Sequence, residues 1–299
     1  MDNKWVYAFA EGDGKNKKLL GGKGANLCEM TRIGLKVPPG FVITTEACLA
    51  CLATPERSLP DGVMVQVREQ MAALEAATGR TFGGRAKPLL VSVRSGSAMS
   101  MPGMMDTILN LGLNAETLQG LIAQTGNPRF GYDAYRRFIQ LFGKVALGVP
   151  DEAFDAEFEA VKQQAGVKHD IGLSAADLAA IAERFLAVVQ DATGRPFPVD
   201  PHEQLEISIK AVFNSWLGKR AVDYRREFNI TPAMANGTAV NVVTMVFGNM
   251  GDDSATGVGF TATPIRADRK SLARSQGGVF DAMVLGPTMR ELINRGSLC

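Results

Sequence analysis

Five short apolar segments along the chain have the pattern of β-strands. They are residues 5–9, 41–44, 88–94, 237–247 and 257–261. The third runs into a polar turn at 95–97. The fourth is β-branched and alternating, and the fifth is expected to pair with it as an antiparallel hairpin. Because helical segments separate the earlier strands, the pattern predicts a mixed α/β layer.

Apolar residues that recur every three or four positions predict helices between these strands. After a glycine turn at 21–24, helical spacing continues to Ile33, and Gly34 is a natural C-terminal stop. Thr44 or Thr45 can cap the next helix. Two further helices are expected at residues 62–77, with Gly79 past the end, and at 205–216, after a proline-rich linker at 196–201.

Residues 112–199 have a different pattern, with few strand-like segments and frequent helix-capping residues. Asp151 begins one expected helix, and Ser174 with Asp177 resembles a capping box that opens another. This stretch is therefore predicted to be a helical subdomain.

Composition and charge narrow the possible function classes. The chain has 299 residues, of which 46% are apolar and 21% are charged, as is typical of a folded soluble protein. Its 32 Lys and Arg nearly balance 31 Asp and Glu, so no net field draws it to nucleic acid or an anionic membrane, and neither partner is expected. No apolar stretch approaches the roughly 18 residues of a membrane helix, and a cytoplasmic location is expected.

The cysteine and histidine residues do not lead to the assignment of a metal site. Cys48 and Cys51 form a Cys-x-x-Cys pair, which is compatible with half a zinc site or a redox pair. The interpretation as two buried residues on one helix face is favoured, because His169 and His202 lie far along the chain. Neither histidine is assigned a catalytic role.

The glycine turn is the first candidate for ligand chemistry. Gly21, Gly22, Lys23 and Gly24 lie between an expected strand and an expected helix, where backbone N–H groups, the helix dipole and one lysine can converge on phosphate. The spacing is not that of a Walker loop. Taken alone, the string is equally compatible with glycines that only make the turn.

A second basic residue ends a later strand. Arg94, which precedes Ser95, can donate two forked hydrogen bonds to phosphate oxygens, and a surface salt bridge is the alternative. Together, Lys23 and Arg94 indicate a polyphosphate ligand, and their cationic groups are expected to meet in space.

Residues 101–107 form an irregular segment rich in methionine and glycine. Such a loop can close over a nucleotide, or it can fill an irregular gap in the core. One arginine of the pair at 136–137 could point inward to an anion, but a solvated charged face is favoured for this pair and for the pair at 225–226.

Six sequence motifs are more specific than the isolated residues considered so far. They are residues 19–27 (LLGGKGANL), 91–96 (VSVRSG), 101–113 (MPGMMDTILNLGL), 126–130 (GNPRF), 135–140 (YRRFIQ) and 237–248 (GTAVNVVTMVFG). Together they closely resemble the N-terminal region of the pyruvate, phosphate dikinase family. The resemblance extends from Trp5 to Thr261, and the string at 101–113 separates this family from phosphoenolpyruvate synthase.

The resemblance implies an ATP-grasp nucleotide-binding domain with an inserted helical subdomain and an incomplete second lobe. The implied parts are a first lobe at 1–111 and 200–243, the helical insertion at 112–199, the start of a second lobe at 244–261 and a divergent tail at 262–299.

By motif position, the resemblance implies that Lys23 and Arg94 contact the phosphates of ATP and act catalytically. They would neutralise charge on the transferring phosphoryl group, together with Mg²⁺. The implied nucleotide-binding set is Gly21, Gly22, Lys23, Arg94, Ser95, Gly103, Met105, Thr256 and Gly257.

In this family, ATP phosphorylates a histidine on a swivelling domain, which carries the phosphoryl group to pyruvate on a TIM barrel. Inorganic phosphate is the other acceptor. The resemblance thus implies the ATP-binding portion of an enzyme that converts ATP, pyruvate and phosphate into AMP, phosphoenolpyruvate and diphosphate. It also implies a homodimer at full length.

The chain also departs from the family pattern. The family's acidic pair for Mg²⁺, its Gln-Thr-Arg element, the carrier histidine and the barrel are absent from this sequence, so no metal ligand is assigned. After Thr261 the tail resembles a superfamily 2 DNA helicase segment around Thr-Ala-Thr-Pro, without a Walker loop. The alternatives are a catalytically inactive nucleotide-binding or interaction fragment, and DNA binding through the tail.

Overall fold

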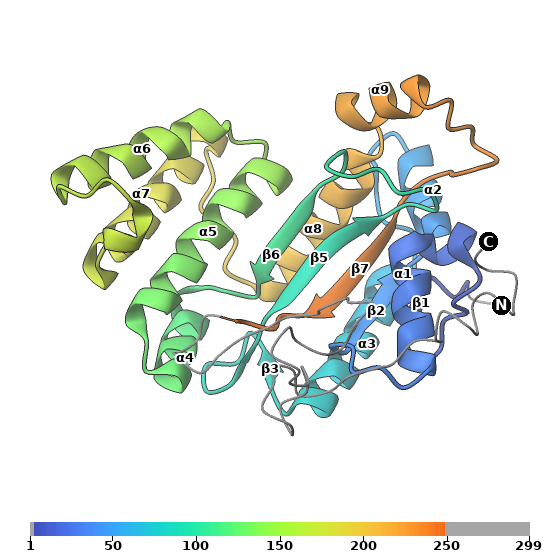
Figure 1. The fold of residues 1–299 in the computed structure, drawn as a ribbon, viewed down its shortest axis with the longest axis horizontal. Helices are drawn as coiled ribbons and strands as arrows, with labels where there is room; N and C mark the ends of the chain where they lie inside the picture. Colours follow the sequence, from blue (N-terminus) through green and yellow to red (C-terminus); the bar gives the residue numbers. More distant parts are fainter. Residues whose placement is uncertain (1–2, 249–299) are drawn as a thin grey trace, which may run out of the picture. The chain divides into compact units, whose positions relative to one another are not determined.

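The computed structural model describes residues 3–248, which form a mixed α/β structure around one antiparallel sheet (Figure 1). The strand order is β1-β2-β7-β5-β6. The strands are β1 (Val6–Ala8), β2 (Gly40–Ile43), β5 (Val91–Gly96), β6 (Thr107–Leu111) and β7 (Ala239–Thr244). A separate parallel pair consists of β3 (Thr81–Phe82) and β4 (Pro88–Leu89). The expected α/β fold class is confirmed.

Strand β7 is the last strand within residues 3–248 but lies at the centre of the sheet. Its Asn241 pairs with Val42 of β2 on one side and with Arg94 of β5 on the other. The expected strand at 237–247 is therefore present. The predicted hairpin partner, residues 257–261, lies outside the described residues, and β2 and β5 already occupy both edges of the middle of β7.

The expected strand at 88–94 differs from its prediction in two ways. Leu90 separates β4 from β5, and β5 continues through Ser95 and Gly96, where a turn was predicted. These two residues pair with Val240 and Ala239 of the central strand. The turn preference of Ser and Gly is a local tendency, and pairing with β7 overrides it.

Helix α1 (Lys17–Arg32) begins before the glycines rather than after them. Asn16 caps it by accepting a hydrogen bond from the Leu19 N–H at 3.1 Å. Gly21 then interrupts the helical path with φ 68° and ψ 164°. The helix expected after the glycines is therefore present, but a helical turn that was not predicted precedes the kink, because residues 17–20 lack apolar helical spacing. The stop at Gly34 is confirmed by its φ of +81°.

Three further helices around the sheet agree with the predicted ones. They are α2 (Thr45–Ala53), α3 (Val63–Thr78) and α8 (Pro201–Ser215). Thr44 caps α2 by accepting from the Ala47 N–H at 3.2 Å. Cys48 and Cys51 are fully buried on α2, as the favoured interpretation has it, and burial raises the pKa of the Cys48 thiol to about 12.

Helix α9 (Lys219–Glu227) is not among the predicted helices. Its Arg225 lies over the ring of Trp216, with the guanidinium carbon 3.8 Å from the ring centroid. This contact departs from the solvated face predicted for the arginine pair, whereas Arg226 is exposed as predicted.

The regular elements of residues 112–199, a fully described stretch, are helices. They are α4 (Ala115–Thr125), α5 (Pro128–Ala146), α6 (Asp151–Gln164), the 3₁₀ turn η1 (Asp170–Gly172) and α7 (Ala175–Thr193). The capping box is present, with Ser174 Oγ accepting from the Asp177 N–H at 3.2 Å. Helix α5 contacts β6 and α8, and Figure 1 shows α6 and α7 on the far side of α5 from the sheet.

Arg136 on α5 is a second departure from the predicted solvated faces. Its side chain is only 5% exposed, its Nη2 lies 2.7 Å from Asp133 Oδ1, and its guanidinium lies over the ring of Phe158. Its neighbour Arg137 is exposed, as predicted. Adjacent helical residues point about 100° apart, so only one of the pair can turn inward.

The two faces of the sheet are covered differently. Val93, Val240 and Val242 lie on one face and join the main core under α2, α3, α5 and α8. Strand alternation places Asn241 and Arg94 on the other face, where α1 contacts β2, β5 and β7. Arg94 stays exposed there, so the described elements leave this face open around β5 and β6.

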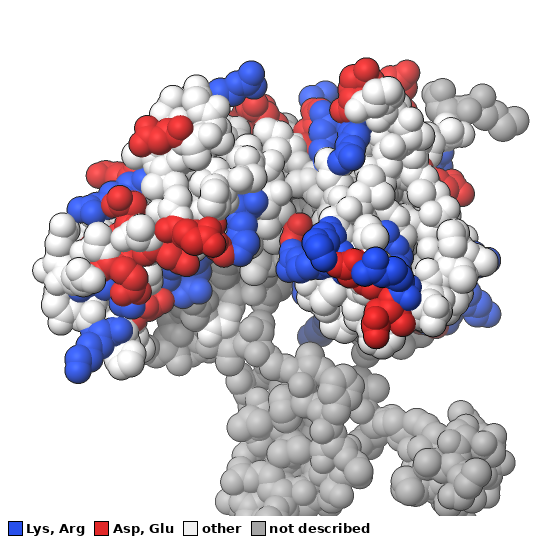
Figure 2. Space-filling view, turned by 90° about the horizontal axis from the view of Figure 1, so that it is seen from above, with Lys and Arg blue, Asp and Glu red and all other residues white. Residues whose placement is uncertain are grey.

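Surface charge agrees with the balanced composition. Figure 2 shows Lys and Arg interspersed with Asp and Glu on the face that it presents, without a broad patch of one sign. In residues 3–248, no helix has the length and apolar character needed to cross a membrane.

Candidate functional site

The glycine kink of α1 is in close contact with the end of β5. A Cβ on Gly21 would lie 1.7 Å from the carbonyl oxygen of Gly96, so only glycine fits. The Gly22 N–H donates to the carbonyl oxygen of Ser97 at 2.8 Å. That N–H is therefore not open to a phosphate, contrary to one hypothesis for this turn. Gly21 and Gly22 thus bring the helix backbone against the end of β5.

Lys23 follows the kink and is half-buried. Its Nζ donates to the carbonyl oxygen of Ser95 at 3.0 Å, which leaves further N–H donors for another partner. Burial, and to a lesser degree the charge of Arg94, lower the pKa of Lys23 to about 8. The structure thus brings Lys23 and Arg94 close enough for their charges to interact.

Arg94 projects from the open face of β5. Its cross-strand neighbours are Thr107 on β6 and Asn241 on β7, and Asn241 Nδ2 donates to the Arg94 carbonyl oxygen at 3.3 Å. Among the described residues, no carboxylate lies within ion-pair distance of Lys23 or Arg94. The surface salt bridge considered for Arg94 is therefore not seen in this part of the chain.

Ser95 reaches this site with its backbone only. Its side chain is buried, and strand alternation directs it to the face opposite Arg94. Ser95 therefore contributes the carbonyl oxygen that holds Lys23, and its hydroxyl does not face the two cations.

The loop at 97–106 connects β5 to β6 and contains Gly103 and Met105. It leaves β5 at Ser97, against Gly22, and returns to the sheet at Thr107, opposite Arg94. Gly103 is exposed with φ +72°, whereas Met105 is half-buried beside a cluster of Met101, Trp216 and Ala235. Both ends of the loop therefore lie at the cation pair, while its middle lies against α9. Thr256 and Gly257 lie outside the described residues.

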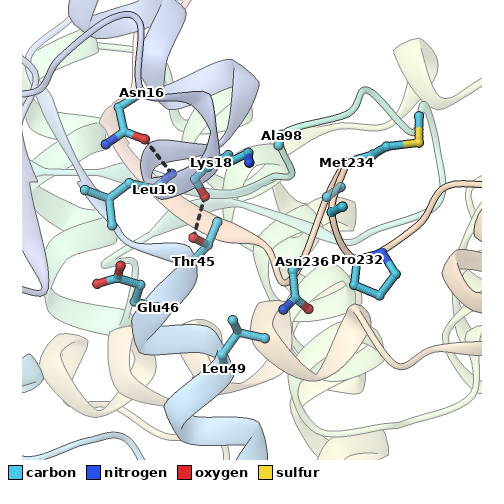
Figure 3. A pocket seen from close by; sticks show the side chains of 12 residues that line it. Asn16, Lys18, Leu19, Thr45, Glu46, Leu49, Ala98, Pro232, Met234 and Asn236 are labelled. Carbon is cyan, nitrogen blue, oxygen red and sulfur yellow. Dashed lines mark hydrogen bonds between the residues drawn. The ribbon is translucent and has the colours of Figure 1, made fainter.

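Sequence reasoning missed a hollow of about 310 Å³ (Figure 3). It lies between the start of α1, the start of α2 and residues 232–236, and Ala98 also lines it. Thr45 Oγ1 donates to the carbonyl oxygen of Lys18 at 2.6 Å and so ties the two helices together at this point. Its lining comes from four segments distant in sequence, of which the sequence indicated only the possible cap at Thr45.

Comparison with protein families gives a match to the model described as pyruvate phosphate dikinase, AMP/ATP-binding domain, over residues 17–56 and 53–286. The second match runs past Thr261, where the sequence resemblance was expected to end. The divergent tail at 262–299 stays a prediction, because it lies outside the described residues.

Three curated relatives are pyruvate, phosphate dikinases. The Entamoeba histolytica protein is 60% identical over 259 residues, which are 87% of this chain and 29% of the relative. The Clostridium symbiosum protein is 49% identical over 89% of this chain and 30% of its own length. A chloroplastic protein of Arabidopsis thaliana is 49% identical over 89% of this chain and 28% of its own length. The chain thus spans less than a third of each relative.

Proposed function

Because the chain belongs to the family of pyruvate phosphate dikinase AMP/ATP-binding domains, we propose that it binds ATP with the phosphates at Lys23 and Arg94. The observation that carries this proposal is the meeting of these two cations on an open sheet face, with no carboxylate partner among the described residues. A polyphosphate placed there would relieve their mutual repulsion. Arg94 can also donate forked hydrogen bonds, while Lys23 supplies a compact charge.

In the proposed reaction, the bound ATP supplies a phosphoryl group to a carrier histidine in another part of a full-length enzyme. The overall change converts ATP, pyruvate and phosphate into AMP, phosphoenolpyruvate and diphosphate. Lys23 and Arg94 would stabilise the charge that moves onto the phosphate oxygens during transfer. The proposal includes a cytoplasmic homodimer at full length, with the carrier-histidine and pyruvate-binding domains as partners.

Mg²⁺ is implied by the family but is not supported by the described residues. In residues 3–248, no group of three or more His, Cys, Asp or Glu side chains is arranged to hold a metal. Because Mg²⁺ at nucleotides often needs only one or two carboxylates in addition to the phosphates, the described residues assign no Mg²⁺ ligand, and no step of the proposal is assigned to the ion.

Calorimetric titration of the 299-residue chain with ATP tests the proposal. Lys23→Met and Arg94→Gln are each expected to weaken binding by about tenfold or more, since a charge-assisted hydrogen bond is worth about 1.5–3 kcal/mol. AMP affinity should fall less, because AMP carries fewer phosphates. Lys36→Met and Arg68→Gln are matched controls at exposed cations and should leave binding unchanged. Equal ATP affinity in all four variants would contradict the proposal.

A nucleotide-binding fragment that transfers nothing is the second candidate. It needs only the nucleotide contacts of Lys23 and Arg94, without a phosphoryl acceptor. Isotope exchange between AMP and ATP separates the two candidates when a carrier-histidine domain is added, because exchange requires a phosphoryl acceptor. Exchange would eliminate the second candidate, and its absence with the acceptor domain present would eliminate phosphoryl transfer by this chain.

A further inference from the structure

We infer that Arg220 is a positioning residue that latches the loop at 97–106, called here the methionine loop, onto α9. Its guanidinium makes two contacts with this loop. Nη1 donates to the carbonyl oxygen of Gly103 at 3.3 Å, and Nη2 lies 3.0 Å from Asp106 Oδ1. One planar side chain thus fixes both a backbone group and a carboxylate of the same loop. Nothing in the sequence distinguishes Arg220 from other arginines in its polar segment.

The ends of the methionine loop are held independently of this latch. Ser97 accepts a hydrogen bond from Gly22, and Thr107, directly after the loop, pairs with Arg94. Met101 is 6% exposed and packs with Trp216. These contacts leave residues 102–106 as the part whose position depends on further interactions.

Helix α9 is itself fixed, which makes it a suitable anchor. Arg225 donates from Nη1 to the Trp216 carbonyl oxygen at 2.9 Å, in addition to lying over the Trp216 ring. Tyr224 packs against the same cluster as Met101. Arg220 therefore ties the loop to an element whose orientation is set by the end of α8.

Apolar packing holds the middle of the loop only in part. Met104 and Met105 are half-buried against the cluster of Met101, Trp216 and Ala235. A hollow of about 450 Å³ remains beside Met104, lined also by Arg220, Tyr224 and Phe228, and a Cβ on Gly103 would have no atom within 4 Å. The two contacts of Arg220 therefore hold Gly103 and Asp106, on either side of the two packed methionines.

The latch is polar and accessible to solvent, so it holds the loop reversibly. The Arg220 side chain is 64% exposed and that of Asp106 is 28% exposed, and exposed ion pairs contribute little to global stability. Its loss should therefore change the local position of the loop without unfolding the protein. The consequence for nucleotide affinity rests on the proposed function, because Gly103 and Met105 are expected to line that pocket.

Hydrogen exchange of the 299-residue chain tests the latch without any ligand. In Arg220→Gln, amides of residues 103–106 should exchange about two- to fivefold faster, as expected from losing one exposed ion pair, with no change in the unfolding midpoint. Arg226→Gln is the matched control, because within residues 3–248 the ion-pair partner of Arg226 is Asp223 of its own helix. The charge-swapped pair Arg220→Asp with Asp106→Arg should recover part of the protection.

Loop exchange in Arg220→Gln equal to that of the wild type and of Arg226→Gln would overturn the inference. So would a charge swap that exchanges as fast as Arg220→Gln. ATP titration then separates this inference from the proposed function. Wild-type chain that fails to bind ATP would defeat the proposed function alone, whereas loosened loop exchange with a two- to fivefold weaker ATP affinity, by the same estimate, supports both.

Discussion

The surroundings of Lys23 disfavour its charged form in the absence of an anion. It is drawn into the structure by the Ser95 carbonyl oxygen, and its charged form is disfavoured by burial and by Arg94. A bound polyphosphate would reverse both effects, because it supplies the opposite charge. Binding of a polyphosphate would therefore offset the free-energy cost that burial and Arg94 impose on the charged form of Lys23.

We predict that ATP binding takes up a proton in the pH range where free Lys23 is partly neutral. Its pKa is lowered from 10.5 to about 8 in the folded chain, and bound phosphate should raise it again. Titration calorimetry above pH 8, in buffers of different ionisation enthalpy, measures this uptake. Lys23→Met should abolish the uptake and Lys36→Met should retain it. Undiminished proton uptake by Lys23→Met would assign the effect to another group.

The lowered pKa of Lys23 also determines whether the folding stability of the ligand-free chain rises or falls with pH. Between about 8 and 10.5 the unfolded chain binds more protons at Lys23 than the folded chain does. The stability contributed by Lys23 is therefore fully present above pH 10.5 and is lost as the pH falls through about 8.

At the scale of elements, the contact of α1 with the sheet determines where Lys23 lies. The kink at Gly21 removes a side chain at the point where the helix backbone meets Gly96. Gly24, three residues later in α1, also lies close to the sheet, because a Cβ there would be 2.9 Å from Asn241 Oδ1 on β7. Glycine spacing in α1 thus sets the distance between the helix and strands β5 and β7.

We predict that Gly21→Ala destabilises the fold by about 3 kcal/mol or more, because it adds a backbone clash to an unfavourable φ. Gly166→Ala is the matched control, since Gly166 has nearly the same φ, +67° against +68°, but a methyl group added there would have no atom within 4 Å. The control should cost only about 1 kcal/mol. Urea unfolding monitored by circular dichroism gives both values. Equal losses in the two variants would show that α1 does not meet β5 as described.

At the scale of the whole described region, one hydrophobic core joins the sheet to the helices of residues 112–199. The same cluster of buried residues contains Val6 on β1, Phe138 on α5, Phe185 on α7 and Val242 on β7. The helical stretch therefore shares its core with the sheet, even though its sequence pattern changes sharply.

We predict that residues 3–248 unfold in one cooperative transition, because the shared core couples both parts. Far-ultraviolet circular dichroism reports mainly the helices, whereas single-tryptophan variants Trp5→Phe and Trp216→Phe report the end of α8 and the sheet edge, respectively. The three urea midpoints should coincide. An earlier or later transition seen by circular dichroism alone would show that the helical stretch unfolds by itself.

The sequence by itself determined the elements whose information is local. Capping residues such as Thr44 and Ser174 and the helix stop at Gly34 satisfy backbone groups within a few positions, so the chain carries their instructions directly. The two cations were also identified from their local strings. The resemblance to a known family added the expected ligand.

Only the tertiary structure decided which distant residues meet. Strand β7 inserts between β2 and β5, and this pairing extends β5 through Ser95 and Gly96. The burial of Arg136 likewise depends on Phe158 and Asp170 from other segments. The contacts of Arg220 with the methionine loop depend on Gly103 and Asp106. Such contacts arise from cross-strand hydrogen bonding and from packing between segments remote in sequence, which no local pattern encodes.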